Sequence, residues 1–388
     1  MTTSKDIFHY LLGAFLAVST FFYLPNPPNM SVPQAMENFY NIQELFIRYG
    51  IMALFGVSLF MKPERTATLK TFAGFFLYVL GISSFISFDL QQRRAILNIF
   101  LGLVFYKMIV EHFDRRYLKV VSLAILAVIA GNILFSIGQI FNVDPLFRHT
   151  SDTVVGFPRP VGLMRLEAHL GTLAAITGPL LMMIHPVLIV TVLPLLFWGS
   201  ASAAVLAFVV SMGFLLYHQL NKKVFFVLFA LLAAAGLFYI VNYDMPGGTF
   251  DYRLKIWFKS LQAVLPRSPF YGLGIGSFAR WSPQSAQATN DSPLVWIWAH
   301  NEYIQLLFEL GIVGVFFFWR WFKERFQDLR RCVKDVQFRY AFASFLGLSI
   351  VSFFHFPFHL GRLAGISLFS IALVHALALD NERTVCES

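Results

Sequence analysis

The run LKVVSLAILAVIAGNILFSIGQIF, residues 118–141, decides the class of fold. It is apolar over more than the roughly 20 residues that a helix needs to cross a bilayer. The whole chain has the same character: hydrophobic residues make up 57% of its 388 residues, charged residues only 13%, and the mean hydropathy is +0.65. A soluble domain carries about 25% charged residues. The sequence therefore predicts an all-α polytopic membrane protein.

Apolar runs of this kind recur along the chain, and we predict about twelve transmembrane helices in a single integral membrane domain, residues 1–388. Ile7–Tyr23 is interpreted as a span because no small-residue cleavage site follows it. Val187–Trp198 is short, and Pro186 and Pro194 predict a bent or partial helix there. The other runs are Leu45–Met61, Leu69–Phe88, Ala95–Val110, Leu166–Ile184, Ala201–Tyr217, Val224–Val241, Tyr303–Trp319, Phe338–Phe354 and Leu363–Leu379.

Basic residues set the expected orientation, because Lys and Arg gather on the cytoplasmic side of spans. With the N-terminus inside, the largest inner cluster is Arg320–Arg339, and Arg93 and Arg94 are the main outer exception. Both termini are therefore expected in the cytoplasm. The net charge of +9 is explained by such anchoring residues and by contact with anionic membrane lipids, so no nucleic-acid partner is expected. Cys332 and Cys386 imply no disulfide framework.

Two segments are then left on the outer, periplasmic side, residues 142–165 and residues 242–301. Loops of this length are usually functional or disordered. The longer one contains four of the seven tryptophans. Within it, Asp251–Leu265 predicts an amphipathic helix with Leu254, Trp257, Phe258 and Leu261 on one face, which would lie on the membrane surface.

Three patterns in or beside the longer loop carry the candidate chemistry. They are Arg253 shortly before Trp257, the turn GLGIGSF at residues 272–278, and His300-Asn301 ahead of Glu309-Leu310-Gly311 and Gly314. No strand precedes the glycine turn, so it is not a dinucleotide-binding fingerprint. It predicts tight turns that bring the backbone close to a glycan or to the membrane.

Together these patterns resemble the bacterial O-antigen ligase and polymerase family of membrane glycan transferases, the ligase branch above all. That family carries an Arg before a Trp, a Pro-x-x-Gly-x-Gly-x-Gly turn, and His-Asn ahead of a Glu-Leu-Gly-x-x-Gly helix. The matching positions are Arg253, Pro269, Gly272, Gly274, Gly276, His300, Asn301, Glu309, Leu310, Gly311 and Gly314.

The resemblance implies a GT-C-like fold and a metal-independent, inverting glycosyltransferase that uses no cofactor. A glycan would leave undecaprenyl diphosphate and join a sugar hydroxyl of lipid A–core at the periplasmic face of the inner membrane. In other members the acceptor is another lipid-linked repeat (O-antigen polymerase) or a Ser or Thr (protein O-oligosaccharyltransferase). The last kind tends to have an extra C-terminal outer region, which this chain lacks after its last apolar run.

The chemistry of such a transfer suits two of these side chains. The attacking hydroxyl needs a base, and His has an ordinary pKa of about 6.5. Guanidinium groups bind phosphate oxygens and stabilise a leaving diphosphate. We therefore expect His300 as the base and Arg253 as the diphosphate clamp, with Asn301, Gly274 and Gly276 as substrate contacts. The alternatives are a histidine beside an aromatic belt and a snorkelling arginine.

The shorter outer segment offers Arg159 and Arg165 as further phosphate contacts. Arg159 and Gly162 match the family pattern, whereas its Pro-Asn pair is replaced by Glu167-Ala168. Charges at the mouth of a span are costly unless they are paired or functional. The alternative is therefore a surface pairing of Arg165 with Glu167 or of Arg159 with Asp152.

A second departure concerns the Ser-Arg pair that opens the eighth span in many members. Residues 199–203 here read GSASA, without an arginine. Arg362, beside His355 and His359, is the candidate replacement as a substrate contact. Pro357 lies between those two histidines and disfavours helical metal-ligand geometry, so no metal is expected.

A transporter or flippase without bond chemistry is the competing class of function. Transporters place polar residues in the middle of their spans and often contain inverted repeats. Here no repeat is evident and the polar residues gather in the outer loops. The sequence therefore favours an enzyme.

Overall fold

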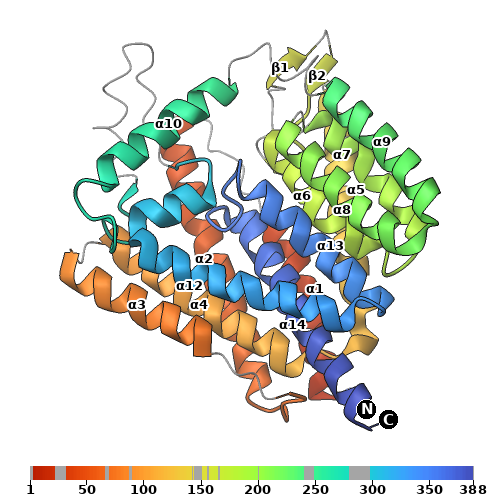
Figure 1. Cartoon of the computed structure of the whole chain (residues 1–388), viewed down its shortest axis with the longest axis horizontal. Helices are drawn as coiled ribbons and strands as arrows, with labels where there is room; N and C mark the ends of the chain where they lie inside the picture. Colours follow the sequence, from red (N-terminus) through yellow and green to blue (C-terminus); the bar gives the residue numbers. More distant parts are fainter. Residues whose placement is uncertain are drawn as a thin grey trace.

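Helices dominate the computed structural model, which describes residues 3–21, 32–65, 70–86, 90–141, 143, 151–154, 157–164, 167–199, 201–239, 249–278 and 298–387 (Figure 1). Each of the twelve predicted apolar runs coincides with helical structure, and α10 falls on the predicted amphipathic segment. The bounds are α1 Ser4–Phe21, α2 Val32–Ser58, α3 Lys70–Ile86, α4 Leu90–His112, η1 Arg115–Tyr117, α5 Leu118–Ile140, α6 Glu167–Leu181, η2 Pro186–Val192, α7 Leu193–Trp198, α8 Ser202–Gln219, α9 Lys222–Tyr239, α10 Thr249–Val264, α12 Glu302–Cys332, α13 Val336–Val351 and α14 Gly361–Glu387.

The lengths and apolarity of these helices identify a helical membrane protein. Among the described residues, five helical segments are long and apolar enough to cross a membrane: Gln92–His112, Arg115–Ile140, Ser202–Gln219, Glu302–Cys332 and Leu363–Glu382. Shorter apolar helices cover Ala73–Ile82, Ala168–Leu181, Pro186–Trp198 and Val336–Val351. The total of about twelve crossings and the GT-C-like arrangement stay predictions.

Helix α13 lies at the centre of the packing, in contact with α6, α8 and α14. Its approach to α6 is close, because a Cβ on Gly347 would lie 2.8 Å from the Ala175 carbonyl oxygen. The Ser344 hydroxyl donates to the Ile176 carbonyl at 2.6 Å. Small residues and hydroxyl groups of this kind let helices associate in lipid, where apolar burial gives little driving force.

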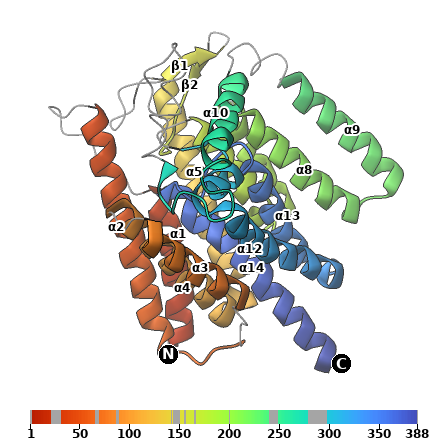
Figure 2. The same ribbon diagram turned by 60° about the vertical axis from the view of Figure 1, so that its left-hand side comes forward.

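The seventh apolar run is bent, as its prolines predicted. Pro186–Val192 forms the 3-10 helix η2, and Leu193–Trp198 forms the short helix α7. One feature was not expected from an all-α interpretation: Ser151–Val154 (β1) and Phe157–Arg159 (β2) pair as an antiparallel hairpin. Figures 1 and 2 show this hairpin and α10 at one end of the bundle and both termini at the other.

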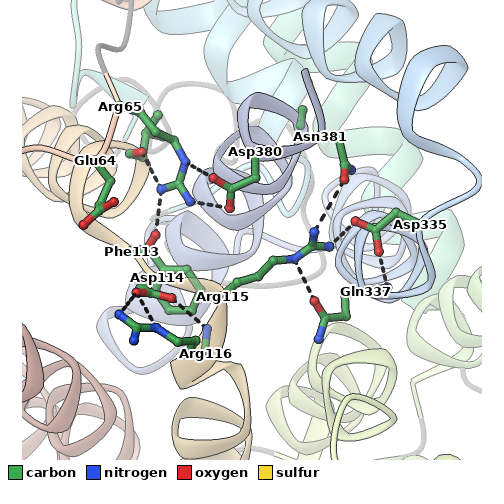
Figure 3. A network of polar contacts seen from close by, with 12 residues as sticks. Glu64, Arg65, Phe113, Asp114, Arg115, Arg116, Asp335, Gln337, Asp380 and Asn381 are labelled. Atoms are coloured by element: carbon green, nitrogen blue, oxygen red, sulfur yellow. Dashed lines mark hydrogen bonds and ion pairs between the residues drawn. The ribbon is translucent and has the colours of Figure 1, made fainter. Parts of the chain in front are cut away.

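A polar network closes the end of the bundle that carries the termini (Figure 3). We call it the terminal clasp, and its charged members are Lys5, Glu64, Arg65, Asp114, Arg115, Arg116, Asp335 and Asp380. Arg65 is buried, pairs with Asp380 through two nitrogens, and donates to the Phe113 carbonyl at 2.6 Å. Arg115 pairs with Asp335 and donates to the Gln337 carboxamide oxygen at 2.8 Å. The clasp thus ties α4, α13 and α14 together.

Candidate active site

The glycine turn of residues 272–276 packs into a break in α12. Gly311 has φ 64° and ψ −169° inside that helix, which divides it into Glu302–Leu310 and Ile312–Cys332. The approach is backbone to backbone: a Cβ on Gly272 would lie 2.4 Å from the Glu309 carbonyl, and a Cβ on Gly311 would lie 2.4 Å from the Phe270 carbonyl. Only glycine leaves this space open.

Breaking a helix inside a membrane leaves backbone groups that need new partners. The glycine turn supplies most of them. Leu273 N–H donates to the Phe308 carbonyl and Gly274 N–H to the Glu309 carbonyl, each at 2.9 Å. On the other side of the break, Ile312 N–H donates to the Pro269 carbonyl at 2.9 Å. The hydroxyl of Tyr78 on α3 donates to the Leu310 carbonyl at 2.8 Å.

These bonds explain the spacing of the glycine and Glu-Leu-Gly patterns. The Glu309 carboxylate is buried and accepts from Gly276 N–H at 2.9 Å and from the Gln305 amide at 3.2 Å. The N–H groups of Gly274 and Gly276, expected to contact substrate, are therefore occupied by Glu309. The structure gives these glycines the role of shaping the site.

His300 stands immediately before the first turn of α12. It has φ 51°, an uncommon conformation for a residue other than glycine, and such strain clusters at functional sites. The next residue, Asn301, is the N-cap: its side-chain oxygen accepts from Ile304 N–H at 3.0 Å. Asn301 is buried, so the structure gives this expected substrate contact a helix-capping role that fixes where His300 lies.

Helix α10 carries Arg253 and is tied to the same point of the chain. Its Trp257 indole N–H donates to the Ala299 carbonyl, directly before His300, at 2.9 Å. The predicted apolar face is divided in the structure, because Leu254 and Phe258 are exposed whereas Trp257 turns toward the protein. Val264 at the end of α10 packs in a small core with Phe278, Ala299 and Phe308.

The electrostatics of His300 reflect this placement. Burial, and then the positive charge of Arg253, lower the pKa of His300 to about 4. The imidazole is therefore neutral at pH 7, the form that accepts a proton. Its ring meets the edge of Phe356, with ring centroids 4.8 Å apart. The structure thus brings His300 and Arg253, the two expected catalytic residues, within electrostatic reach of each other.

A second cluster of polar side chains lies beside His300 and consists of Glu302, Gln305 and His359. The sequence did not predict that these three residues meet. His359 Nδ1 lies 2.9 Å from a Glu302 carboxylate oxygen, and its Nε2 lies 3.1 Å from the Gln305 amide nitrogen. Burial opposes protonation, but the Glu302 carboxylate raises the pKa of His359. These residues hold the loop between α13 and α14 against the start of α12. Their helical spacing, with Gln305 three residues after Glu302, was a signal available in the sequence.

Residues 161–163, in the shorter of the two predicted outer segments, are held by side chains of α5 that accept hydrogen bonds from their backbone N–H groups. The Gln139 side-chain oxygen on α5 accepts from Val161 N–H at 2.8 Å and from Gly162 N–H at 2.9 Å. Asn132 accepts from Leu163 N–H at 3.0 Å. Gln139 and Asn132 were missed, although polar residues inside an apolar run are a signal of such roles. The segment leads to His169, whose ring lies 5.1 Å from that of His355.

The side chains of three expected phosphate contacts lie outside the described part of the structure. Arg165 lies outside the described residues, and so do the side chains of Arg159 at the end of β2 and Arg362 in the first turn of α14. The pairings of Arg159 and Arg165 with acidic neighbours fall there too. Within the described part of the chain, no group of three His, Cys, Asp or Glu side chains is placed to hold a metal ion.

Comparison with known proteins bears on this region directly. Residues 187–319 match a family model described as O-antigen ligase. No curated protein matches the chain. The matched segment contains α8, α9, α10, the glycine turn, His300 and the break in α12. Over this segment, the match supports the family that the sequence patterns indicated.

Proposed function

We propose, on the premise that residues 187–319 place the chain in the O-antigen ligase family, that the protein is an O-antigen ligase. It would transfer a glycan from undecaprenyl diphosphate to a sugar hydroxyl of lipid A–core. The family match supports a ligase or polymerase type of activity. The choice of ligase rests on the His-Asn spacing ahead of the Gly-x-x-Gly helix, which is closest to the ligase branch.

The observation that carries this proposal is the pairing of His300 with Arg253. A neutral imidazole, held in a strained backbone conformation by a capped helix, lies within the field of a guanidinium group. A base and a cation are what the reaction needs: one to accept a proton from the attacking hydroxyl, the other to stabilise the diphosphate as it leaves.

The proposed step is a single displacement at the anomeric carbon. The acceptor oxygen forms a bond to that carbon while the bond from carbon to the diphosphate oxygen breaks, which inverts the configuration. The hydroxyl proton passes to His300, and the bonding electrons leave with the diphosphate beside Arg253. The anionic donor would itself raise the pKa of His300 when bound and make it a stronger base.

The membrane orientation belongs to the same proposal. The terminal clasp and both termini would lie in the cytoplasm, and α10 with His300 would face the periplasm across the inner membrane. Donor and acceptor are both lipids, so they would reach the site laterally through the bilayer. Exposed Leu254 and Phe258 on α10 would lie in the membrane surface.

A gel of lipopolysaccharide from a deletion strain tests the proposed function. A strain lacking the ligase should show bare lipid A–core while lipid-linked polymer accumulates in the membrane. A strain lacking a polymerase should show core that bears one repeat unit, and this result would replace the ligase by the polymerase. Unchanged lipopolysaccharide would exclude both and would direct attention to glycosylated proteins or to a transporter.

A further inference from the structure

His169 and His355 form a buried histidine pair beside His300. Their rings meet edge to face with centroids 5.1 Å apart. His355 stacks on Phe356 at 4.8 Å, and the edge of the same phenyl ring meets His300 at 4.8 Å. Phe356 therefore contacts two imidazoles, that of His355 in the loop after α13 and that of His300 just before α12, and His169 on α6 contacts His355.

One imidazole nitrogen of the pair makes no hydrogen bond among the described residues. His355 is 5% exposed, and its Nδ1 has no hydrogen-bond partner among the described residues. Leaving a buried polar group unpaired is energetically unfavourable. Such a cost in a protein interior needs an explanation, and a ligand that supplies the partner is one.

The surroundings of His355 indicate what kind of ligand that is. Burial, and then His169 on α6, His300 before α12 and Arg253 on α10, all disfavour a proton on His355. The carboxylate of Glu302, in contrast, is engaged by His359 at 2.9 Å. A group entering between these imidazoles and Arg253 is therefore favoured if it is an anion.

His112 shows that an unpartnered nitrogen alone would not be enough. Its Nδ1 is also buried without a partner among the described residues, at the last position of α4 near the terminal clasp. There the surrounding charges include the carboxylates of Glu111 and Glu64. An anion would be repelled from His112 and attracted to His355.

We propose that the pair His169 and His355 is a proton-coupled binding subsite for the diphosphate of the lipid-linked donor. The inference rests on the proposed function and adds a binding role for residues outside the His300–Arg253 pair. An imidazole N–H of the pair would donate to a phosphate oxygen. A proton taken from solvent would enter with the anion and leave when the diphosphate product is released.

The physical reason for proton uptake is the change of surroundings on binding. Before an anion binds, burial and the neighbouring charge of Arg253 lower the pKa of His355. A diphosphate placed against the pair reverses the sign of the local field and favours the protonated form. Binding should therefore tighten as the pH falls, and the part of this dependence that His355 contributes should be lost when His355 is replaced.

The test measures binding of radiolabelled undecaprenyl diphosphate to the full chain in phosphatidylcholine nanodiscs between pH 8 and pH 6. His355→Leu should weaken binding about tenfold or more, because it removes a hydrogen bond to a charged group. His355→Asn keeps a donor near the Nδ1 position but cannot take up a proton, so its affinity should change less with pH than that of the wild type. His112→Asn is the matched control and should bind as the wild type does.

The outcomes separate the two proposals. A wild-type protein that binds no undecaprenyl diphosphate would overturn the proposed function together with this inference. Wild-type affinity and pH dependence in both His355 variants, with binding lost in Arg253→Ala, would overturn the inference alone. Displacement of the donor by equimolar phosphatidylglycerol would also overturn it, because the pair would then be a site for a lipid headgroup.

Discussion

The terminal clasp and the region of His169, His300, His355 and Arg253, here called the histidine site, are polar regions at opposite ends of the bundle. They differ in how their charges are balanced. In the clasp, Arg65 meets Asp380 and Arg115 meets Asp335. At the other end, the guanidinium of Arg253 is the charged group that acts on both His300 and His355. The charges of the clasp are thus matched in pairs, whereas the positive charge of Arg253 beside His300 and His355 suits an anion.

The difference teaches how to distinguish structural from functional polar groups in a membrane protein. Intramembrane and interfacial charges are expensive, so each one needs a partner or a task. Within the clasp the partners are carboxylates of the same chain, and the task is to hold helix ends together. At the histidine site we propose that the task is to bind substrate. Substitutions in the two regions should therefore affect different quantities.

The largest expected effect is on catalysis at His300. His300→Ala should reduce glycan transfer by about 10²–10⁴-fold, the usual contribution of a general base. Membrane expression should be unchanged, because the cap of α12 is provided by Asn301 and not by His300. Normal O-antigen decoration in a null strain carrying this variant would contradict the site assignment.

Gly311→Ala should come next and should act on both folding and activity. A Cβ there would lie 2.4 Å from the Phe270 carbonyl, and φ is 64°. The break in α12 and the glycine turn would have to separate, which should lower the yield of monodisperse protein in detergent and the activity of what survives. Gly56→Ala is the control, since nothing lies within 4 Å of its added Cβ. Equal behaviour of the two variants would show that the break is not needed.

A substitution in the clasp should change stability and leave the chemistry unaffected. Asp380→Asn leaves the buried Arg65 without its carboxylate, and breaking a buried ion pair costs roughly 3–5 kcal/mol. Thermal unfolding in detergent should occur at a clearly lower temperature than in the wild type. An unchanged transition would mean that the clasp contributes little to the fold.

The dependence of activity on pH should reveal the depressed pKa of His300. With that pKa at about 4, the imidazole stays neutral as the pH falls from 8 to about 5, so protonation of His300 should not limit kcat/KM in this range. Because kcat/KM reports the free enzyme, its profile should be level or should rise toward pH 6. A loss of activity centred near pH 6.5 would indicate an imidazole with an ordinary pKa.

The smallest effect is expected from the hydrogen bond that links α10 to the residue before His300. Trp257→Phe removes the hydrogen bond to the Ala299 carbonyl, worth about 1 kcal/mol. Transfer should slow about fivefold, and the temperature of unfolding should change little. A wild-type rate would show that α10 is positioned by its apolar contacts with the Val264 core alone.

The sequence predicted the helices well because their signal is local. An apolar run such as Leu118–Phe141 needs no knowledge of its neighbours to form a helix in lipid. The proline-bent segment Pro186–Trp198 was predicted for the same reason, since proline acts on its own backbone. The hairpin of β1 and β2 was missed because such short strands carry little periodic pattern.

The residues of the candidate site could be named from the sequence, but their geometry could not. His300 and Arg253 were named from their motif, yet the contact of Gly272 with Gly311 depends on two segments that meet only in the folded chain. For the same reason, the roles of Gly274 and Gly276 are clear only in the folded chain. There their N–H groups donate to the backbone carbonyl and to the carboxylate of Glu309. The histidine pair is likewise formed by residues from separate helices.

One measurement tests the central contrast most directly: the rate of glycan transfer per folded molecule for Arg253→Gln and Asp380→Asn, side by side in nanodiscs. Each substitution removes one charge, the first from the histidine site and the second from the terminal clasp. We predict that Arg253→Gln folds normally and loses transfer, whereas Asp380→Asn yields less folded protein with a wild-type rate. The reverse pattern, transfer retained without Arg253 and lost without Asp380, would contradict the account.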